Sequence, residues 1–378
     1  METAPSLTTA LDAQLRQIIA AAGGWIGFDR FMEIALYTPG LGYYTRDDAQ
    51  FGMRPSDAPG GGGDFVTAPE MSRFFGRALA AQVAQALEVT GTREIWEFGA
   101  GSGALAAQLL GALAGRIDRY TIVDLSGSLQ QRQRASLFAF GDKVRWEGSL
   151  PQQLQAVVVG NEVLDAMPVR LLARLGGVWH ERGVVLAADG RRAWADRPTD
   201  LRPPLQVPGE HDYLTEIHPQ AEGFVRMLAD RLERGAAFLV DYGFPEREYY
   251  HVQRSTGTVM CHRAHRMDTD PLADVGQKDI TAHVNFTGLA LAAQEAEAGR
   301  VPPPAGRFGV LGYTTQARFL MNCGLLQMLE HATLPERVMG QKLLMEHEMG
   351  ELFKVIGFCR GEAWDALGFS QGDRTHTL

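Results

Sequence analysis

The chain has 378 residues, of which 45% are hydrophobic and 21% are charged. This is ordinary globular usage, and it excludes a disordered chain, a coiled coil and a collagen-like fibre. Acidic residues outnumber basic ones by 45 to 36, and the net charge of −9 argues against a protein that coats nucleic acid, because phosphate binding needs clustered Lys and Arg.

The N-terminal part of the chain is expected to be mainly helical. Apolar residues at near-helical spacing predict a helix over residues 6–23, a short helix within residues 31–44 and another over residues 71–89. Residues 55–63 end in four glycines and are predicted to form a loop. We therefore group residues 1–90 as a helical region that contains a glycine-rich loop.

Strands and helices alternate from residue 94 onward, which predicts a parallel α/β sheet. The expected strands are 94–98, 120–125, 144–147 and 156–159, and the expected helices are 104–114 and 126–138. Glycine-containing turn signals then separate three strand-like runs within residues 169–197, so an antiparallel meander is predicted there.

The α/β pattern resumes after the meander. The expected elements are a helix over 218–234, a strand over 236–242, an irregular stretch over 243–287, helices near 314–333 and 335–350, and a final strand over 352–358. The predicted fold class is α/β, a mostly parallel Rossmann-like sheet with helices on both faces. The expected core comprises residues 91–168 and 235–378, and residues 169–234 form an insertion of meander and helix.

A glycine-rich turn follows the first strand of this core. Its sequence is Glu97-Phe98-Gly99-Ala100-Gly101-Ser102-Gly103, and glycines at such a turn let a ligand approach the backbone closely. The G-x-G-x-G spacing favours S-adenosylmethionine over a dinucleotide, although Ala104 also satisfies the dinucleotide pattern. A tight turn without a ligand is the structural alternative.

Two acidic residues near this turn fit the same ligand. Glu97 suits the cationic amino-acid part of S-adenosylmethionine, and the alternative is a solvent-facing charge at a strand end. Asp124 ends the next strand, where an acid can accept hydrogen bonds from ribose hydroxyls. Its alternative role is a helix N-cap.

A second constellation, Asn161-Glu162-Val163-Leu164-Asp165, follows the fourth strand. On a helical turn, Glu162 and Asp165 would share one face, because they are three residues apart. Two carboxylates in one cleft could hold a guanidinium and take the proton that methylation releases. The structural alternative is a helix start whose acids complement the helix dipole.

The cysteines, the histidines and the lack of long apolar runs bear on redox state, metal binding and cellular location. The three cysteines form no CxxC pair and are expected to be reduced, buried thiols. His251, His262 and His265 lack the spacing of a metal site, and no metal is expected. No apolar run approaches the ~20 residues of a membrane helix, and the chain does not start with a signal-like segment. We expect no membrane insertion and a cytoplasmic protein.

Together these segments resemble the MidA/NDUFAF7-type S-adenosylmethionine-dependent methyltransferases, from about residue 12 to residue 358. The matching segments are 37–44 (YTPGLGYY), 63–72 (GDFVTAPEMS), 97–105 (EFGAGSGAL), 160–168 (GNEVLDAMP), 241–243 (DYG), 270–272 (DPL), 279–286 (DITAHVNF), 315–320 (TQARFL) and 350–357 (GELFKVIG). Segments 63–72 and 160–168 are the most specific of these.

The resemblance implies a class I methyltransferase core and a protein arginine methyltransferase whose mitochondrial members act on a subunit of respiratory complex I. The catalytic residues would be Glu162 and Asp165. The cofactor-binding residues would be Asp64, Thr67, Pro69, Glu70, Glu97, Gly99, Ala100, Gly101, Gly103, Asp124, Leu125 and Asn161. Asn285 departs from the family pattern, in which an Asp is frequent, and this bears on substrate choice.

Several alternatives stay open at this stage. The acceptor could be a small molecule or another side chain, since a fold does not choose its substrate. A binding or assembly factor that retains the fold without catalysis is a different class of function, and an NAD-dependent enzyme is the most distant alternative. The sequence also leaves open a homodimer through the meander or the C-terminal helices.

Overall fold

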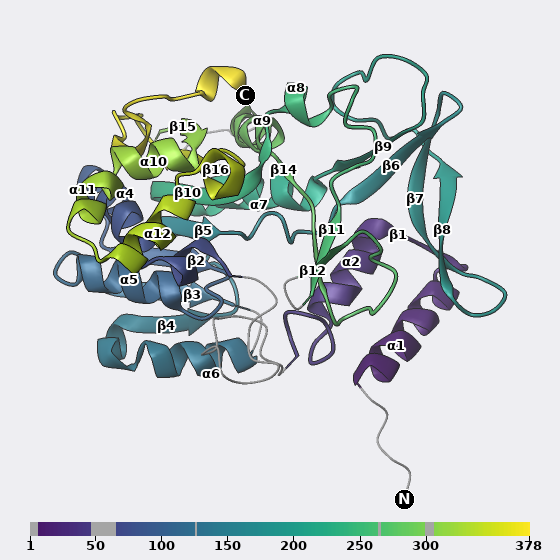
Figure 1. Ribbon diagram of the computed structural model, residues 1–378, viewed down its shortest axis with the longest axis horizontal. Coiled ribbons are helices and arrows are strands. Elements are labelled where there is room, and N and C mark those ends of the chain that lie inside the picture. The colour runs from purple at the N-terminus through teal and green to yellow at the C-terminus, as the bar shows by residue number, and fades with distance from the viewer. Residues whose placement is uncertain (1–6, 47–65, 125–126, 264–265, 299–305) are drawn as a thin grey trace, which may run out of the picture.

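The computed structural model describes residues 7–46, 66–124, 127–263, 266–298 and 306–378. Its centre is an eight-stranded sheet in the order β15-β16-β10-β5-β2-β3-β4, with β14 paired to β10 (Figure 1). The strands are β2 (Glu94–Phe98), β3 (Arg119–Val123), β4 (Val144–Glu147), β5 (Leu154–Asn161), β10 (Leu232–Phe244), β14 (Val284–Asn285), β15 (Phe308–Thr315) and β16 (Phe353–Arg360).

The sheet is mostly parallel, as the sequence predicts. Strands β10, β5, β2, β3 and β4 run parallel, whereas β16 pairs antiparallel with β10 and with β15. From β2 the chain adds strands β3 and β4 on one side, and then crosses to β5 and β10 on the other. In such sheets the order reversal opens a crevice at the carboxyl ends of the strands, here between β2 and β5.

Helices cover both faces of the sheet. Successive residues of β5 point to opposite faces, so that Val157 and Val159 join one core cluster while Ala156 and Val158 join another. The first cluster contains side chains of α4 (Arg73–Thr90), α5 (Ala104–Leu113), α10 (Gln316–Asn322) and α11 (Leu325–Glu330), and the second those of α7 (Pro219–Arg231) and α9 (Phe286–Ala298).

A second layer of structure lies beside the carboxyl ends of the core strands (Figure 1). The expected meander pairs with two further strands in an antiparallel sheet, and α1 (Leu7–Ala21) and α2 (Phe28–Tyr37) pack against it in a third apolar cluster. The strands are β1 (Trp25–Gly27), β6 (Arg170–Leu175), β7 (Val178–Leu186), β8 (Arg192–Pro198) and β9 (Tyr213–Ile217). The N-terminal helices and the inserted meander therefore share one core.

Some sequence expectations are wrong. Residues 243–287 are not irregular, since they contain α8 (Glu246–Tyr249), β14 and a small sheet of β11 (Met260–Arg263), β12 (Arg266–Asp268) and β13 (Asp279–Thr281). The helix expected near residue 314 begins at Gln316, after strand β15, and the next expected helix is the shorter α12 (Leu334–Lys342). Strands β13, β14 and β15 are specified by pairing partners farther away in the chain, which local patterns do not show, whereas β11 and β12 pair with each other.

Other findings concern single features. Cys261, Cys323 and Cys359 are buried free thiols, as expected. Among the residues that the structure describes, no helix combines the length and the apolarity needed to span a bilayer. The predicted glycine-rich loop at residues 55–63 lies outside the described residues. The division of the chain at residues 90, 168 and 234 stays a proposal.

Candidate functional site

The glycine-rich turn joins β2 to α5 and requires its glycines. Gly99, Gly101 and Gly103 have φ angles of 62°, 52° and 84°, a left-handed conformation that side chains rarely adopt. A Cβ atom on Gly99 would lie 3.2 Å from Val163 Cγ2, and one on Gly103 would lie 2.9 Å from Ser136 Oγ. The turn therefore presents bare backbone at the crevice between β2 and β5.

A cavity of about 660 Å³ opens beside this turn. It brings together most of the predicted site residues: Thr67, Pro69, Glu70, Glu97, Gly99, Ala100, Gly101, Asp124, Asn161 and Glu162. Gly103 and Asp165 do not line it. Asp64 and Leu125 lie outside the described residues.

Glu97 is a buried acid at the end of β2. It is 2% exposed, and its Oε2 accepts a hydrogen bond of 2.7 Å from the Tyr120 hydroxyl. Burial raises the pKa of Glu97 to about 8, against the opposing effect of the Tyr120 hydrogen bond. A cation bound in the cavity would reverse this penalty, because an opposite charge favours the ionised carboxylate.

Asp124 is held in place by Gln133 of α6 (Gly127–Ser136). Gln133 Nε2 donates to Asp124 Oδ2 at 2.8 Å and to the Gly101 carbonyl at 3.0 Å, while its Oε1 accepts from Trp146 Nε1 at 2.9 Å. This buried amide ties the acid to the glycine turn. Sequence reasoning missed Gln133, because its partners lie on other elements.

The segment before α4 lies over the turn. It includes α3 (Ala68–Met71), where Gln108 Nε2 donates to the Pro69 carbonyl at 2.7 Å. The Ser102 side chain hydrogen-bonds to the Glu70 carboxyl, which lowers the pKa of Glu70, but burial has the larger effect and raises it. Thr67, Pro69 and Glu70 thus reach the cavity from a part of the chain far from the glycine turn.

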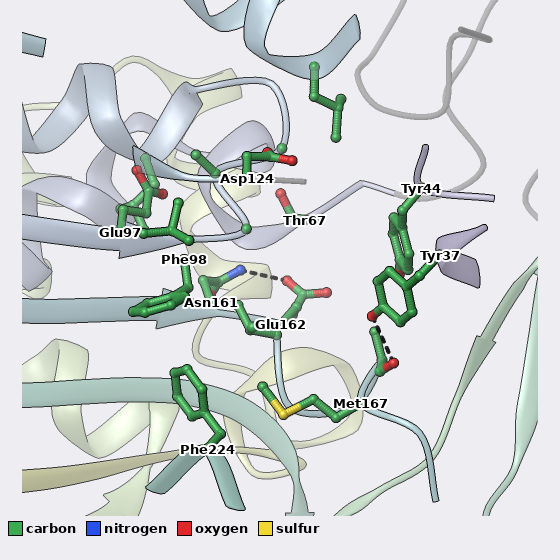
Figure 2. A pocket seen from close by; sticks show the side chains of 18 of the residues that line it. Tyr37, Tyr44, Thr67, Glu97, Phe98, Asp124, Asn161, Glu162, Met167 and Phe224 are labelled. Carbon is green, nitrogen blue, oxygen red and sulfur yellow. Dashed lines mark hydrogen bonds between the residues drawn. The ribbon is translucent and has the colours of Figure 1, made fainter. Parts of the chain in front are cut away.

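Glu162 occupies the centre of the cavity (Figure 2). Its backbone has a φ of 53°, unusual for a residue other than glycine, and its amide donates to the Val240 carbonyl at 2.8 Å. Asn161 Nδ2 donates to its Oε1 at 2.9 Å, whereas the buried Asn161 Oδ1 has no partner. Burial, followed by the charge of Asp165, raises the pKa of Glu162 to about 8.

The expected position of Asp165 on one helical face with Glu162 is wrong. Residues 162–168 form no helix, so Asp165 does not share a helical face with Glu162. Its carboxyl is buried behind the cavity wall, where it hydrogen-bonds to the Tyr242 hydroxyl, and burial raises its pKa to about 6. The turn folds this way because Asp241 Oδ2 accepts the backbone amides of Val163, Leu164 and Asp165 at 2.8–3.2 Å.

The remaining wall was not predicted as part of the site. Tyr37 and Tyr44 line it beyond Glu162, and an apolar side is formed by Met167, Phe224 and Met227 (Figure 2). The Tyr37 and Tyr44 rings stack with centroids 5.6 Å apart. Both tyrosines belong to the segment 37–44, one of those that carry the family resemblance. That resemblance was the signal in the sequence that could have identified them as site residues.

The charge of the cavity is one-sided. Its described lining includes the acids Glu33, Glu70, Glu97, Asp124 and Glu162, and no Lys, Arg or His. Because burial disfavours lone carboxylates, such a lining suits cationic ligands. The positive-φ glycines, the buried Glu97 and the orphan Asn161 Oδ1 fit S-adenosylmethionine, which carries a sulfonium and an ammonium group.

Comparison with known proteins identifies the family and cofactor. A family model described as "Putative S-adenosyl-L-methionine-dependent methyltransferase" matches residues 78–303. A Burkholderia thailandensis protein, solved with S-adenosyl-homocysteine bound, is 47% identical over the whole of both chains, with a TM-score of 0.91. S-adenosylmethionine is therefore the cofactor, and the chain is a methyltransferase.

Curated relatives refine this assignment. The chain is 28% identical to the Drosophila melanogaster "Protein arginine methyltransferase NDUFAF7 homolog, mitochondrial", over 96% of this chain and 89% of the relative. The Caenorhabditis elegans protein of the same name is 26% identical, over 88% and 82%. These relatives are named mitochondrial, so the expectation of a cytoplasmic protein is wrong. The chain belongs to the MidA/NDUFAF7 family of S-adenosylmethionine-dependent methyltransferases.

Proposed function

We propose that the enzyme methylates an arginine side chain of a protein. The observation that carries this proposal is the described cavity lining, which includes five acids and no basic residue. Such a site suits two cations side by side, the methyl donor and a guanidinium. The apolar side chains of Met167, Phe224 and Met227 suit the methylene stem of an arginine.

At the cofactor end of the cavity, different parts of S-adenosylmethionine would contact either bare backbone or acidic side chains. Gly99, Ala100 and Gly101 would hold it against bare backbone, Asp124 would accept from its ribose, and Glu97 would pair with its ammonium group. When bound, S-adenosylmethionine supplies a methyl group made electrophilic by the neighbouring sulfonium.

Glu162 would orient the acceptor and receive its proton. A free guanidinium stays protonated far above neutral pH and is a weak nucleophile, so a carboxylate that accepts hydrogen bonds from its N–H groups is needed. With a pKa of about 8, Glu162 is mostly protonated at pH 7 in the unliganded protein, and the positive charges of the donor and the acceptor would favour the ionised form that accepts a proton. Asp165 acts through its charge, which raises the pKa of Glu162, and does not contact the acceptor.

The relatives support a protein as the carrier of that arginine. Several of them are named protein arginine methyltransferases, which supports a protein substrate. A respiratory complex I subunit as the acceptor, and a homodimer, stay predictions from the family resemblance. Methylation of a small molecule or of another side chain is the alternative that keeps the same cofactor site.

Labelling of a cell extract tests the acceptor type. Purified enzyme is incubated with extract and isotopically labelled S-adenosylmethionine, and labelled protein is hydrolysed and analysed by mass spectrometry. We expect label in methylated arginine, lost with Gly101→Val, whose folding is checked by thermal denaturation. Label only in small molecules or in another amino acid would refute the arginine assignment. A partner retained by a folded, inactive Gly101→Val protein would favour a binding factor.

A further inference from the structure

The cavity wall beyond Glu162 comes from a separate stretch of chain. Tyr37 ends α2 and Tyr44 follows in the next turn, both before the first residue matched by the family model, residue 78. Figure 2 shows the Glu162 carboxyl extending toward these two rings. An acceptor bound at Glu162 would therefore lie near an aromatic surface.

Hydrogen bonds fix both rings in place. The Tyr37 hydroxyl donates to the Ala166 carbonyl at 2.8 Å, and the Tyr44 hydroxyl donates to Asp279 Oδ1 at 2.8 Å. The ring planes lie 23° apart, and Tyr43 packs edge-on against Tyr44 with centroids 5.1 Å apart. Because the hydroxyls are committed to protein partners, the rings contribute mainly their faces and edges to the cavity.

The electrostatics of this wall favour a cation. Burial and the charge of Asp279 raise the pKa values of both tyrosines, so the phenols stay neutral. Glu33, one turn before Tyr37 on α2, also lines the cavity, and its carboxylate is paired with Arg30 at 2.6 Å, so the attraction for a cation comes from the rings. Aromatic faces attract cations, and a planar guanidinium stacks on a ring more extensively than a compact ammonium does.

We propose that the stacked rings of Tyr37 and Tyr44 select the acceptor, favouring a planar guanidinium over a lysine ammonium at Glu162. Tyr37 is then a specificity-determining residue of the methyltransferase. The inference rests on the proposed function for its substrate class, and it adds which residues make the choice.

Peptide binding tests the wall directly. The probes are the capped peptides acetyl-Gly-Arg-Gly-amide and acetyl-Gly-Lys-Gly-amide, titrated into enzyme saturated with S-adenosyl-homocysteine. We expect Tyr37→Leu to weaken binding of the arginine peptide about tenfold and to change the lysine peptide much less. Tyr37→Phe loses the hydrogen bond to the Ala166 carbonyl but keeps the ring and its stacking on Tyr44, so it should bind the arginine peptide within about twofold of the wild type. The affinity for S-adenosyl-homocysteine should be unchanged in both variants.

A matched variant separates binding from packing. Phe31 lies on the same helix and is fully buried away from the cavity, so Phe31→Leu also removes an aromatic ring but should leave peptide binding unchanged. Tyr37→Met offers an apolar side chain without an aromatic face, and it replaces Tyr37→Leu should that variant not fold.

The outcomes are distinct for the two proposals. Arginine methylation with no effect of Tyr37→Leu overturns the selecting wall and leaves the proposed function standing. Three other results also overturn the selecting wall. Tyr37→Leu could weaken binding of both peptides equally, or Tyr37→Phe could weaken binding of the arginine peptide as much as Tyr37→Leu does. The third is a wild-type enzyme that does not bind the arginine peptide. The enzyme could also bind the arginine peptide in a Tyr37-dependent way and yet label another side chain in the extract. This result refutes the proposed function and leaves the selecting wall standing.

Discussion

Replacing Glu97 with glutamine should change the pH dependence of stability in the unliganded protein. The pKa of Glu97 is raised from 4.5 to about 8 by burial. Between these values the folded state keeps a proton that the unfolded state has lost, so stability falls as pH rises. The slope from this one group is about 1.4 kcal/mol per pH unit between roughly pH 5 and pH 8. Glu97→Gln removes it, because an amide does not titrate.

The assay is chemical denaturation of both proteins at several pH values. The difference in unfolding free energy, variant minus wild type, should grow with pH by about 1.4 kcal/mol per unit and level off near pH 8. Comparing the two proteins cancels the titration of the other acids. A difference that stays constant from pH 5 to pH 8 would show that Glu97 is already ionised in the folded protein.

The same variant tests the role of Glu97 toward the cofactor. At pH 7 a carboxyl with a pKa of about 8 is mostly protonated, so pairing with an ammonium group should release most of one proton from Glu97 on binding. Calorimetric titration of S-adenosylmethionine in buffers of different ionisation enthalpy measures this number. Glu97→Gln should lose that release and bind more weakly. Equal proton release by both proteins would contradict the assignment.

Three further predictions follow from single residues. Glu162→Gln should reduce kcat by about 100-fold or more while S-adenosylmethionine affinity, measured by calorimetry, stays within about twofold; retained turnover would refute its role as proton acceptor. Gln133→Met removes the hydrogen bonds to Asp124 and the glycine turn and should weaken cofactor binding about tenfold, and unchanged affinity would contradict this positioning role. Gly103→Ala should lower stability by about 1–3 kcal/mol because of its positive φ, whereas Gly115→Ala, with open space around it, should be neutral in thermal denaturation.

The parallel core was predictable because its signals are local. Continuous apolar runs such as residues 156–159 mark strands covered on both faces, and β5 lies there, extended at both ends. Strand β15 escaped prediction because Phe308–Thr315 is specified by pairing with β16, far along the chain. Helix α9, Phe286–Ala298, was also missed, although its Ala, Leu, Gln and Glu residues are strong local helix formers.

The site was predictable where one turn supplies it. The glycines and Asp124 follow from strand ends that meet at one edge of the sheet. Asp165 was placed wrongly because the i, i+3 rule assumes a helix, and Asp241 instead organises a turn from a distant strand. The tyrosine wall needs α2, which packs on the meander strands β6 and β7, to lie beside the turn after β5, where Tyr37 donates to the Ala166 carbonyl, and no local pattern reports this.

The tyrosine wall and the glycine turn of the cavity are encoded in separate stretches of sequence. Residues 33–44 supply the tyrosine wall, and residues 97–124 supply the glycine turn and its acids. Changes within the first stretch can reshape the acceptor side without disturbing donor binding. Laboratory evolution toward a new acceptor can therefore start at Tyr37 and Tyr44 and extend to Met167 and Phe224 on the apolar side, with cofactor affinity held constant in the screen.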